Sequence, residues 1–132
     1  MSSLFTKIIQ GEIPCHKVLE SDTCFAFMDI RPVQNGHVLV VPKVEIDRFF
    51  DLSAGQLADI MAFTQQVAVG IKRVFPCDRV GMSVIGLEVP HAHIHLVPIN
   101  SLDDMNFSRP KGNGSSEHLK QVAIQISEAI KV

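Results

Sequence analysis

The sequence predicts an α+β fold in which a five-stranded antiparallel meander sheet is accompanied by one long helix, a short N-terminal helix and a C-terminal helix. Five short apolar segments bounded by turn-forming residues predict the strands, and segments with helical spacing predict the helices. A chain of 132 residues with 46% apolar residues is long enough for one buried core. We therefore expect a single domain over residues 1–132, with its core at about residues 4–100 and a C-terminal extension over residues 101–132.

The first half of the chain is predicted to contain the short helix and three strands. Apolar residues at helical spacing over residues 4–9, followed by Gly11, predict the helix. A polar turn joins the first two strands as a hairpin, and Asn35-Gly36 supplies the tight reversal before the third. These strands are expected at residues 17–20, 24–28 and 37–41.

The second half is predicted to contain the long helix, two more strands and the C-terminal helix. Ser53 and Gln56 resemble a capping box, and the apolar stripe that follows ends near Val74. Residues 101–114 are too polar to form a core of their own. The remaining strands are expected at residues 80–85 and 91–99, and the last helix at residues 116–131.

Three histidines, His91, His93 and His95, alternate with apolar residues in the last predicted strand. Because side chains alternate between the faces of a strand, the three rings are expected on one face and the apolar residues on the other. A neutral imidazole has a pKa of about 6.5 and can act as a nucleophile near pH 7, while a neighbouring ring donates to an anion. The pattern therefore predicts a site for phosphoryl or acyl transfer. One metal ion could reach two of these rings, but hardly all three.

The composition limits the partners that the chain is expected to bind. A net charge of −2, a pI near 6.3 and the lack of Tyr and Trp argue against a polymeric nucleic acid, although a mononucleotide remains compatible. Three widely spaced cysteines predict reduced thiols rather than disulfides or a zinc site. The sequence has neither a secretion signal nor an apolar run of membrane-spanning length. We therefore expect a cytoplasmic protein with no membrane partner.

Around its histidines the sequence resembles the histidine-triad (HIT) superfamily, and within it the Hint-like branch. The segment His91-Ala92-His93-Ile94-His95-Leu96-Val97 matches the alternating signature of that family. Other matching stretches lie in the same order at residues 4–9 with 12–14, 25–30 and 36–43. Together the matches cover most of the chain up to about Asn100.

The resemblance implies a nucleotide phosphoramidase or nucleotidyl hydrolase that needs no cofactor and works as a homodimer with joined sheets. By match to the motif, His93 would attack the α-phosphorus of a purine nucleotide conjugate and form a nucleotidyl-histidine. Water would then release a nucleoside monophosphate such as AMP. His95 would hydrogen-bond a phosphate or leaving-group atom, and His91 would help to orient the ring.

The resemblance also implies how the nucleotide is held. Asp29 resembles the family's ribose-binding acid, and His37 matches a histidine that the family places near the triad. Zinc-containing members use two N-terminal cysteines where this chain has Ser3 and Thr6, so no metal is expected. The apolar slot for the base would be formed by Phe5, Ile8, Phe27, Ile30 and Leu39.

Between the last two strands the chain departs from the Hint-like pattern. That branch has an asparagine and a Gly-rich loop ending in Gly-Gln-Ser, whereas this chain has a shorter loop with Ile85 and Glu88. An ionised Glu88 would repel a phosphate, a protonated one could protonate the departing group, and one that turns away would cap local backbone. We include Glu88 among the substrate-binding residues, near the leaving group.

Three alternatives stay open at the level of the sequence. The first is hydrolysis of dinucleoside polyphosphates, the activity of the Fhit-like branch. The second is a nucleotide-binding regulatory module with low turnover, which the altered loop would favour. The third is a transition-metal site that uses two triad rings and His37.

Overall fold

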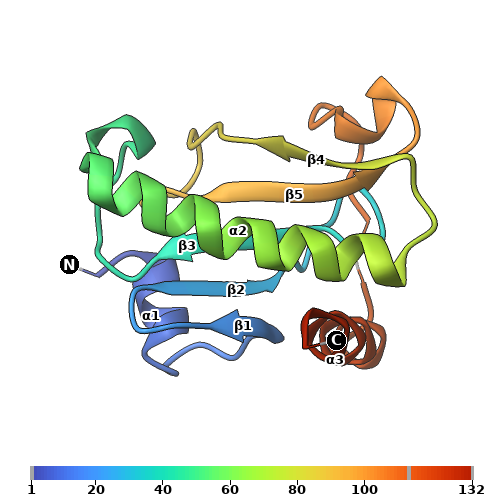
Figure 1. Cartoon of the computed structure of the whole chain (residues 1–132), viewed down its shortest axis with the longest axis horizontal. Coiled ribbons are helices and arrows are strands. Elements are labelled where there is room, and N and C mark those ends of the chain that lie inside the picture. Colours follow the sequence, from blue (N-terminus) through green and yellow to red (C-terminus); the bar gives the residue numbers. More distant parts are fainter. Residues whose placement is uncertain (1, 113, 132) are drawn as a thin grey trace.

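The computed structural model describes residues 2–112 and 114–131, and every predicted helix and strand is present within a few residues of its expected bounds (Figure 1). The helices are α1 (Leu4–Ile9), α2 (Ala54–Val74) and α3 (Ser116–Ile130), with short 3-10 turns η1 (Phe49–Asp51) and η2 (Leu102–Met105). The strands are β1 (Lys17–Glu20), β2 (Cys24–Met28), β3 (Val38–Pro42), β4 (Arg79–Ser83) and β5 (Ile94–Ile99). The predicted α+β class is confirmed.

All five strands form one antiparallel sheet in the order β1-β2-β3-β5-β4. The predicted five-stranded antiparallel sheet is confirmed, but the strand order departs from a simple meander because β5 lies between β3 and β4. The reason is α2, a 21-residue helix that connects β3 to β4 along the chain and runs across the sheet (Figure 1). It carries the chain to the far edge, so that β5 returns as the partner of both strands.

One face of the sheet is covered by α2 and α3, and the main hydrophobic core lies between these layers (Figure 1). Burying an aliphatic side chain contributes about 1.5–3 kcal/mol, so this interface supplies much of the stability of the fold. Alternate residues of the central strands point into it. The core includes Ala26, Met28, Val38, Val40, Ile94 and Leu96 from the sheet, Ile60, Phe63, Val67 and Ile71 from α2, and Leu119, Val122 and Ile126 from α3.

The opposite face of the sheet carries a second, smaller apolar cluster, which α1 partly covers. Its buried members are Phe5, Ile8, Phe25, Phe27, Leu39 and Val41. His95 pairs with Leu39 across β5 and β3, and Leu39 pairs with Phe27 across β3 and β2. Because cross-strand partners share a face, the register places His95 beside this cluster and away from the main core. Ile94 and Leu96 point the other way, as the alternating pattern predicts.

Strand β5 begins at Ile94, three residues later than the sequence predicts. The backbone N–H of Ala92 donates to the Ile46 carbonyl at 2.7 Å, and that of His91 donates to the Val89 carbonyl at 2.8 Å. The chain before β5 is therefore bonded to the loop that follows β3 and not to the sheet ladder. Similarly, β4 ends at Ser83 and not at residue 85.

Helices α1 and α2 each begin after a serine N-cap. The capping box at the start of α2 is confirmed, because Ser53 Oγ accepts from the Gln56 N–H and the Gln56 side chain accepts from the Ser53 N–H. Helix α1 is capped by Ser3, whose Oγ accepts from the Thr6 N–H at 3.0 Å. This cap places Ser3 next to the segment that precedes β5.

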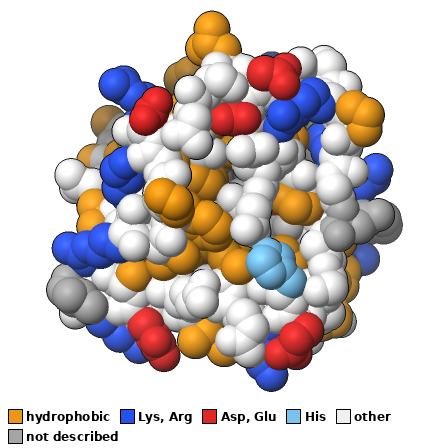
Figure 2. Space-filling model, turned by 90° about the vertical axis from the view of Figure 1, so that its right-hand side faces the viewer, with side chains coloured by type: hydrophobic (Ala, Val, Ile, Leu, Met, Phe, Trp, Pro, Cys, Tyr) orange, Lys and Arg blue, Asp and Glu red, His pale blue; other side chains and the backbone are white. Residues whose placement is uncertain are grey.

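On the face seen in Figure 2, acidic and basic side chains are mixed, and they surround a hollow with an apolar floor. Within residues 2–112 and 114–131, no helix is long and apolar enough to cross a membrane. All three cysteines are free thiols, as the sequence predicts.

Candidate active site

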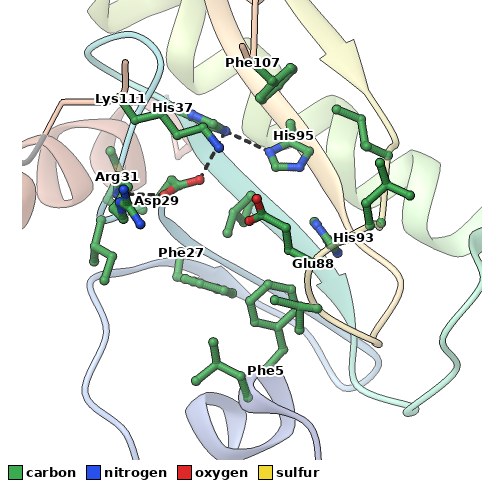
Figure 3. Close-up of a pocket in the computed structure, with 18 of the residues that line it drawn as sticks. Phe5, Phe27, Asp29, Arg31, His37, Glu88, His93, His95, Phe107 and Lys111 are labelled. Atoms are coloured by element: carbon green, nitrogen blue, oxygen red, sulfur yellow. Dashed lines mark hydrogen bonds and ion pairs between the residues drawn. The ribbon is translucent and has the colours of Figure 1, made fainter. Parts of the chain in front are cut away.

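A pocket of about 680 Å³ lies on the α1 side of the sheet, over the ends of β2, β3 and β5 (Figure 3). It combines an apolar wall with histidine and carboxylate side chains, which is the composition expected of a small-molecule site. The residues predicted for the site that line it are Phe5, Phe27, Asp29, Ile30, His37, Leu39, Glu88, His93 and His95. His93 and His95 therefore line the same cavity as the residues predicted to contact the base and the ribose.

His93 is held in a single orientation by its own neighbour. Its Nδ1 lies 2.7 Å from the backbone carbonyl of His91. Because a carbonyl only accepts, Nδ1 must carry the proton and Nε2 keeps its lone pair. The Phe5 ring packs edge-on against the imidazole, with centroids 5.0 Å apart, and helps to fix the ring plane. His93 thus offers an unprotonated nitrogen in a 6% exposed position.

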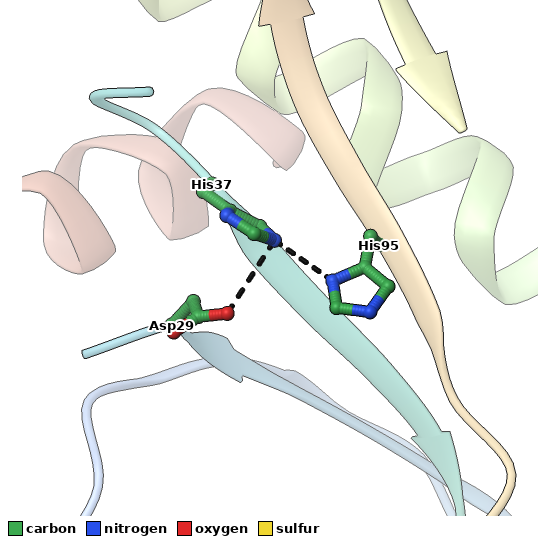
Figure 4. A group of neighbouring side chains, drawn as sticks. All are labelled: Asp29, His37 and His95. Carbon is green, nitrogen blue, oxygen red and sulfur yellow. Dashed lines mark hydrogen bonds and ion pairs between the residues drawn. The ribbon is translucent and has the colours of Figure 1, made fainter. Parts of the chain in front are cut away.

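His95 has the opposite tautomer, and His37 sets it. The Val33 N–H donates to His37 Nδ1 at 3.1 Å, so a neutral His37 carries its proton on Nε2. His37 Nε2 lies 2.9 Å from His95 Nδ1 and therefore donates to it (Figure 4). His95 Nδ1 is then the acceptor, which leaves the proton of this ring on Nε2. A lone pair on His93 and an N–H on His95 stand side by side, with ring centroids 5.0 Å apart.

The pKa values of these rings favour their neutral forms. Burial, followed by the charges of His95 and Lys111, lowers the pKa of His37 to about 3. Burial, followed by His93 and Lys111, lowers the pKa of His95 to about 4. Burial also lowers the pKa of His93, while the hydrogen bond to the His91 carbonyl opposes the shift. All three rings are therefore neutral at physiological pH, as a nucleophile and a neutral donor require.

Asp29 lies at the end of β2, beside His37 and 3.5 Å from its Nε2 (Figure 4). One of its oxygens accepts from the Arg31 N–H at 2.8 Å, which fixes the turn that follows the strand. Burial raises the pKa of Asp29, and the Arg31 N–H opposes that shift. The carboxylate has free acceptor capacity toward the pocket, so its geometry suits paired hydroxyl groups.

His91 does not line the pocket, although it belongs to the triad. Its ring is fully buried, with Nε2 donating to the Pro42 carbonyl at 2.8 Å and Nδ1 accepting from Ser3 Oγ at 2.7 Å. Both nitrogens are thus satisfied when the ring is neutral. The side chain anchors its own backbone, whose carbonyl orients His93.

The anchor of His91 continues to the protein surface through a polar network at the N-terminus. Ser3 Oγ lies between His91 and the start of α1, and Glu45 Oε1 accepts from the Ser3 N–H and from Thr6 Oγ1, each at 2.6 Å. The Ser3 N–H, followed by the Thr6 hydroxyl, lowers the pKa of Glu45. We call Ser3, Thr6, Glu45 and His91 the N-terminal network. Ser3 and Thr6 of this network stand where the zinc-containing members that the sequence resembles have two cysteines.

Ile8 also lies outside the pocket. It is buried in the apolar cluster behind the cavity, together with Phe5 and Phe27. Helical spacing explains the difference: Phe5 and Ile8 share one face of a short helix that packs on the sheet, and only Phe5 reaches the cavity. Ile8 therefore supports the wall that Phe5 and Phe27 form, instead of contacting the base.

Glu88 stands at the pocket mouth, in the loop between β4 and β5, and its carboxylate projects toward the space between Asp29 and His93 (Figure 3). Burial raises the pKa of Asp29, and the charge of Glu88 adds to that shift. Burial lowers the pKa of His93, and the charge of Glu88 opposes that shift. None of the hydrogen bonds or ion pairs among residues 2–112 and 114–131 engages this carboxylate. The backbone-capping role considered from the sequence is therefore not what the structure contains.

Sequence reasoning missed the part of the site that comes from the C-terminal extension. Phe107, Ser108, Arg109, Pro110 and Lys111 all line the pocket. The Phe107 ring packs against the His95 ring at a tilt of 60°, with ring centroids 4.8 Å apart. The only signal in the sequence was an aromatic residue, followed by two cations, in an otherwise polar stretch.

A metal ion would compete with an existing hydrogen bond. Asp29, His37 and His95 place three potential ligand atoms within 4.8 Å of one another. In that group the His37 proton lies between the two rings, and coordination by Nε2 would displace it. The cluster thus has the ligand types for a cation, but in its present arrangement the two neutral rings are hydrogen-bonded to each other beside the Asp29 carboxylate.

Comparisons with known proteins agree with the fold. A family model described as the HIT domain matches residues 10–102. The chain therefore belongs to the histidine-triad (HIT) family. It is 34% identical to adenosine 5'-monophosphoramidase of Schizosaccharomyces pombe over 134 residues, which is 99% of this chain and 100% of that protein.

Two further relatives span nearly the whole chain. An HIT-like protein of Methanocaldococcus jannaschii is 32% identical over 125 residues, covering 90% of this chain and 97% of that one. The crystal structure of an HIT-like protein from Bartonella henselae superposes with a TM-score of 0.85 at 28% identity, covering 97% of this chain and 96% of that one.

Proposed function

We propose that this chain is a nucleotide phosphoramidase that cleaves at the α-phosphate of purine nucleotide conjugates and releases a nucleoside monophosphate. The observation that carries the proposal is the tautomer of His93, whose Nδ1–H is committed to the His91 carbonyl so that Nε2 faces the pocket with a lone pair. The similarity to a fission-yeast adenosine 5'-monophosphoramidase supports the same class of reaction.

In the proposed reaction His93 Nε2 attacks the α-phosphorus while the bond from phosphorus to the leaving nitrogen breaks. The departing amine takes up one proton from water at the open mouth of the pocket. The imidazolium of the nucleotidyl-histidine keeps its Nδ1–H on the His91 carbonyl, which stabilises the positive charge. Water then attacks the phosphorus, His93 recovers its lone pair, and one proton returns to solvent.

His95 and the pocket walls would position the substrate. The Nε2–H of His95 would donate to a phosphate oxygen, because its Nδ1 is already an acceptor of the His37 hydrogen bond. Asp29 would accept from the ribose hydroxyls. Phe5, Phe27, Leu39 and Ile30 would contact the base, and Ile30, which is 63% exposed, would lose solvent contact on binding.

Rapid acid quenching of the protein during turnover of adenosine phosphoramidate tests the covalent step. We expect a nucleotidyl mass on the peptide that contains His93, AMP as product, and loss of both in His93→Ala. His118→Ala is the matched control, because the ring of this exposed histidine on α3 lies outside the pocket and bonds to Asn35 across the surface. Undiminished AMP release by His93→Ala would exclude His93 as the nucleophile.

A homodimer is part of the same proposal. The outer edge of β4 has no partner strand in the described residues, and exposed apolar side chains lie on this strand and directly after it, with Met82 at 50% and Val84 at 37% exposure. Unprotected edges and apolar surface favour association. Light scattering should give twice the chain mass of 14.6 kDa, and a monomer mass at micromolar concentration would overturn this part.

A binding module with low turnover is the second candidate, and the loop between β4 and β5 is the observation that favours it. Ile85 is 43% exposed at the pocket, and its side chain cannot donate to a phosphate. Such a module would bind AMP yet show neither AMP release nor the His93 adduct in the quenching experiment. Dinucleoside polyphosphates, compared in the same assay, test the remaining hydrolase alternative.

A further inference from the structure

The C-terminal extension closes the pocket and is fastened to it at several points. We call residues 106–112 the cover segment. Arg109 Nη2 donates to the Val33 carbonyl at 2.5 Å and lies 3.3 Å from Gln34 Oε1. The N–H of Gly112 donates to the Pro32 carbonyl at 3.1 Å. The cover segment is therefore attached to the same turn whose Val33 N–H orients His37.

Phe107 places the cover segment directly on the rings of His95 and His37. Its ring centroid lies 4.8 Å from that of His95 and 5.9 Å from that of His37. This contact removes water from the outer side of both rings and strengthens electrostatic interactions at that point. A charged group delivered by the same segment acts in a medium of reduced polarity.

Lys111 is that group. Its side chain extends over the pocket toward the space between Asp29 and His95 (Figure 3). Its charge adds to the effect of burial in lowering the pKa values of His37 and His95, so the ammonium acts on both rings. No partner among residues 2–112 and 114–131 holds this ammonium in a hydrogen bond or an ion pair. Arg109, by contrast, is already bonded to Val33 and Asp103.

Among the described residues, no other free cation lies next to His95. His37, His93 and His95 are neutral, and Asp29 and Glu88 are acids. Two arginines also line the pocket, but Arg109 is bonded to Val33 and Asp103, and Arg31 lies on the side of Asp29 away from His95 (Figure 3). A phosphate that entered beside His95 would meet hydrogen-bond donors but no compensating charge, and the Gly-rich phosphate loop of the Hint-like pattern is replaced here by a short loop with Glu88. Binding an anion under these conditions is costly unless a positive group is near.

We propose that Lys111 is the phosphate-binding cation of this site, delivered from the cover segment outside the matched HIT domain of residues 10–102. The inference rests on the proposed function, since it assigns the group that binds the α-phosphate oxygens. Its ligand is the phosphate monoester or diester of a nucleoside. Phe107 and Arg109 are positioning residues, because they hold the cover segment without contacting that phosphate.

Calorimetric titration with AMP and with adenosine separates the phosphate from the rest of the ligand. We expect Lys111→Met to weaken AMP binding about tenfold to a hundredfold, the range for a charge-assisted hydrogen bond, and to leave adenosine binding within about twofold. Lys111→Arg keeps the charge and should retain most of the AMP affinity. Lys120→Met, on the exposed face of α3, removes the same charge at a remote position and should change neither affinity.

Two results would overturn the assignment. One is an AMP affinity of Lys111→Met equal to that of the unsubstituted protein. The other is an equal loss of adenosine binding, which would mean that the substitution released the whole cover segment. In the supporting case, raising the salt concentration weakens AMP binding to the unsubstituted protein much more than to Lys111→Met.

The same titrations distinguish this inference from the proposed activity, because they need no turnover. Protein that binds AMP through Lys111 but hydrolyses no phosphoramidate supports the cation and overturns the phosphoramidase. Protein that hydrolyses phosphoramidates, with equal AMP affinity in Lys111→Met, supports the phosphoramidase and overturns the cation.

Discussion

Ser3→Ala is expected to destabilise the fold and to slow catalysis, although Ser3 does not line the pocket. The Ser3 hydroxyl has two functions in the N-terminal network. It caps α1 by accepting from the Thr6 N–H, and it donates to Nδ1 of the fully buried His91 ring. The substitution removes both bonds but leaves the backbone N–H of residue 3 bonded to Glu45.

The magnitude follows from these two losses. Removing a serine N-cap costs about 1 kcal/mol of stability. Leaving a buried acceptor without a partner costs about 1–3 kcal/mol, and no water can easily reach a ring with 0% exposure. We therefore expect a loss of about 2–4 kcal/mol in the free energy of unfolding. Because His91 also presents the carbonyl that orients His93, kcat should fall with little change in KM.

Urea denaturation monitored by circular dichroism measures the stability term. With a slope of about 1–3 kcal/mol per molar urea, the midpoint should move by about 1 M or more. Thr6→Val is the matched control in the same network. It removes the exposed bond to Glu45 and the longer contacts of Thr6 Oγ1 with Ser3 Oγ (3.2 Å) and His91 Nδ1 (3.4 Å), but it keeps the helix cap and the bond from Ser3 to His91, so it should cost under about 1 kcal/mol. The reasoning is refuted if Ser3→Ala is no more destabilising than Thr6→Val, or if nitrogen NMR shows the His93 tautomer unchanged while kcat falls.

Three further predictions address pH, the leaving group and packing. Burial lowers the pKa of His93 from 6.5, so kcat/KM should stay level as the pH falls through 6.5 and decline only below it; a midpoint at or above 6.5 contradicts this. Glu88→Gln should raise kcat/KM for an anionic leaving group by about threefold to tenfold and leave a neutral amine unaffected, as expected for removing one exposed charge; equal effects on both substrates would exclude a charge role.

Gly70→Ala should lower stability by about 1–3 kcal/mol in thermal unfolding, because an added Cβ would lie 2.5 Å from Ile130 Cγ1 where α2 meets α3. Gly55→Ala, in open space near the start of α2, should be neutral or stabilising. A stabilised Gly70→Ala would show that α3 can move away without cost.

The features that the sequence could predict depend on local patterns. The capping box at Ser53 and the apolar stripe after it define α2 within one residue. The alternation around His93 and His95 separates their rings from Ile94 and Leu96, because a strand imposes a period of two. Those local rules place the rings on the right face without any knowledge of the partner strands.

The features that escaped prediction depend on contacts between distant residues. The bond from Ser3 to His91 spans 88 positions, and that from Arg109 to Val33 spans 76. No periodicity encodes such pairs, so neither the N-terminal network nor the cover segment could be predicted. The strand order depends equally on where α2 takes the chain. His91 was expected beside the other rings, but its segment bonds to the loop after β3.

The position of β5 between β3 and β4 has a consequence for how activity arises during folding. This strand is the last to be synthesised, yet it joins the first three strands to the edge strand. Until it docks, the sheet exists as two separate parts, and His95 lacks the bond from His37 that fixes its tautomer. Such late, long-range closure is slow, so ligand affinity should emerge together with the final cooperative step and be absent from any earlier intermediate.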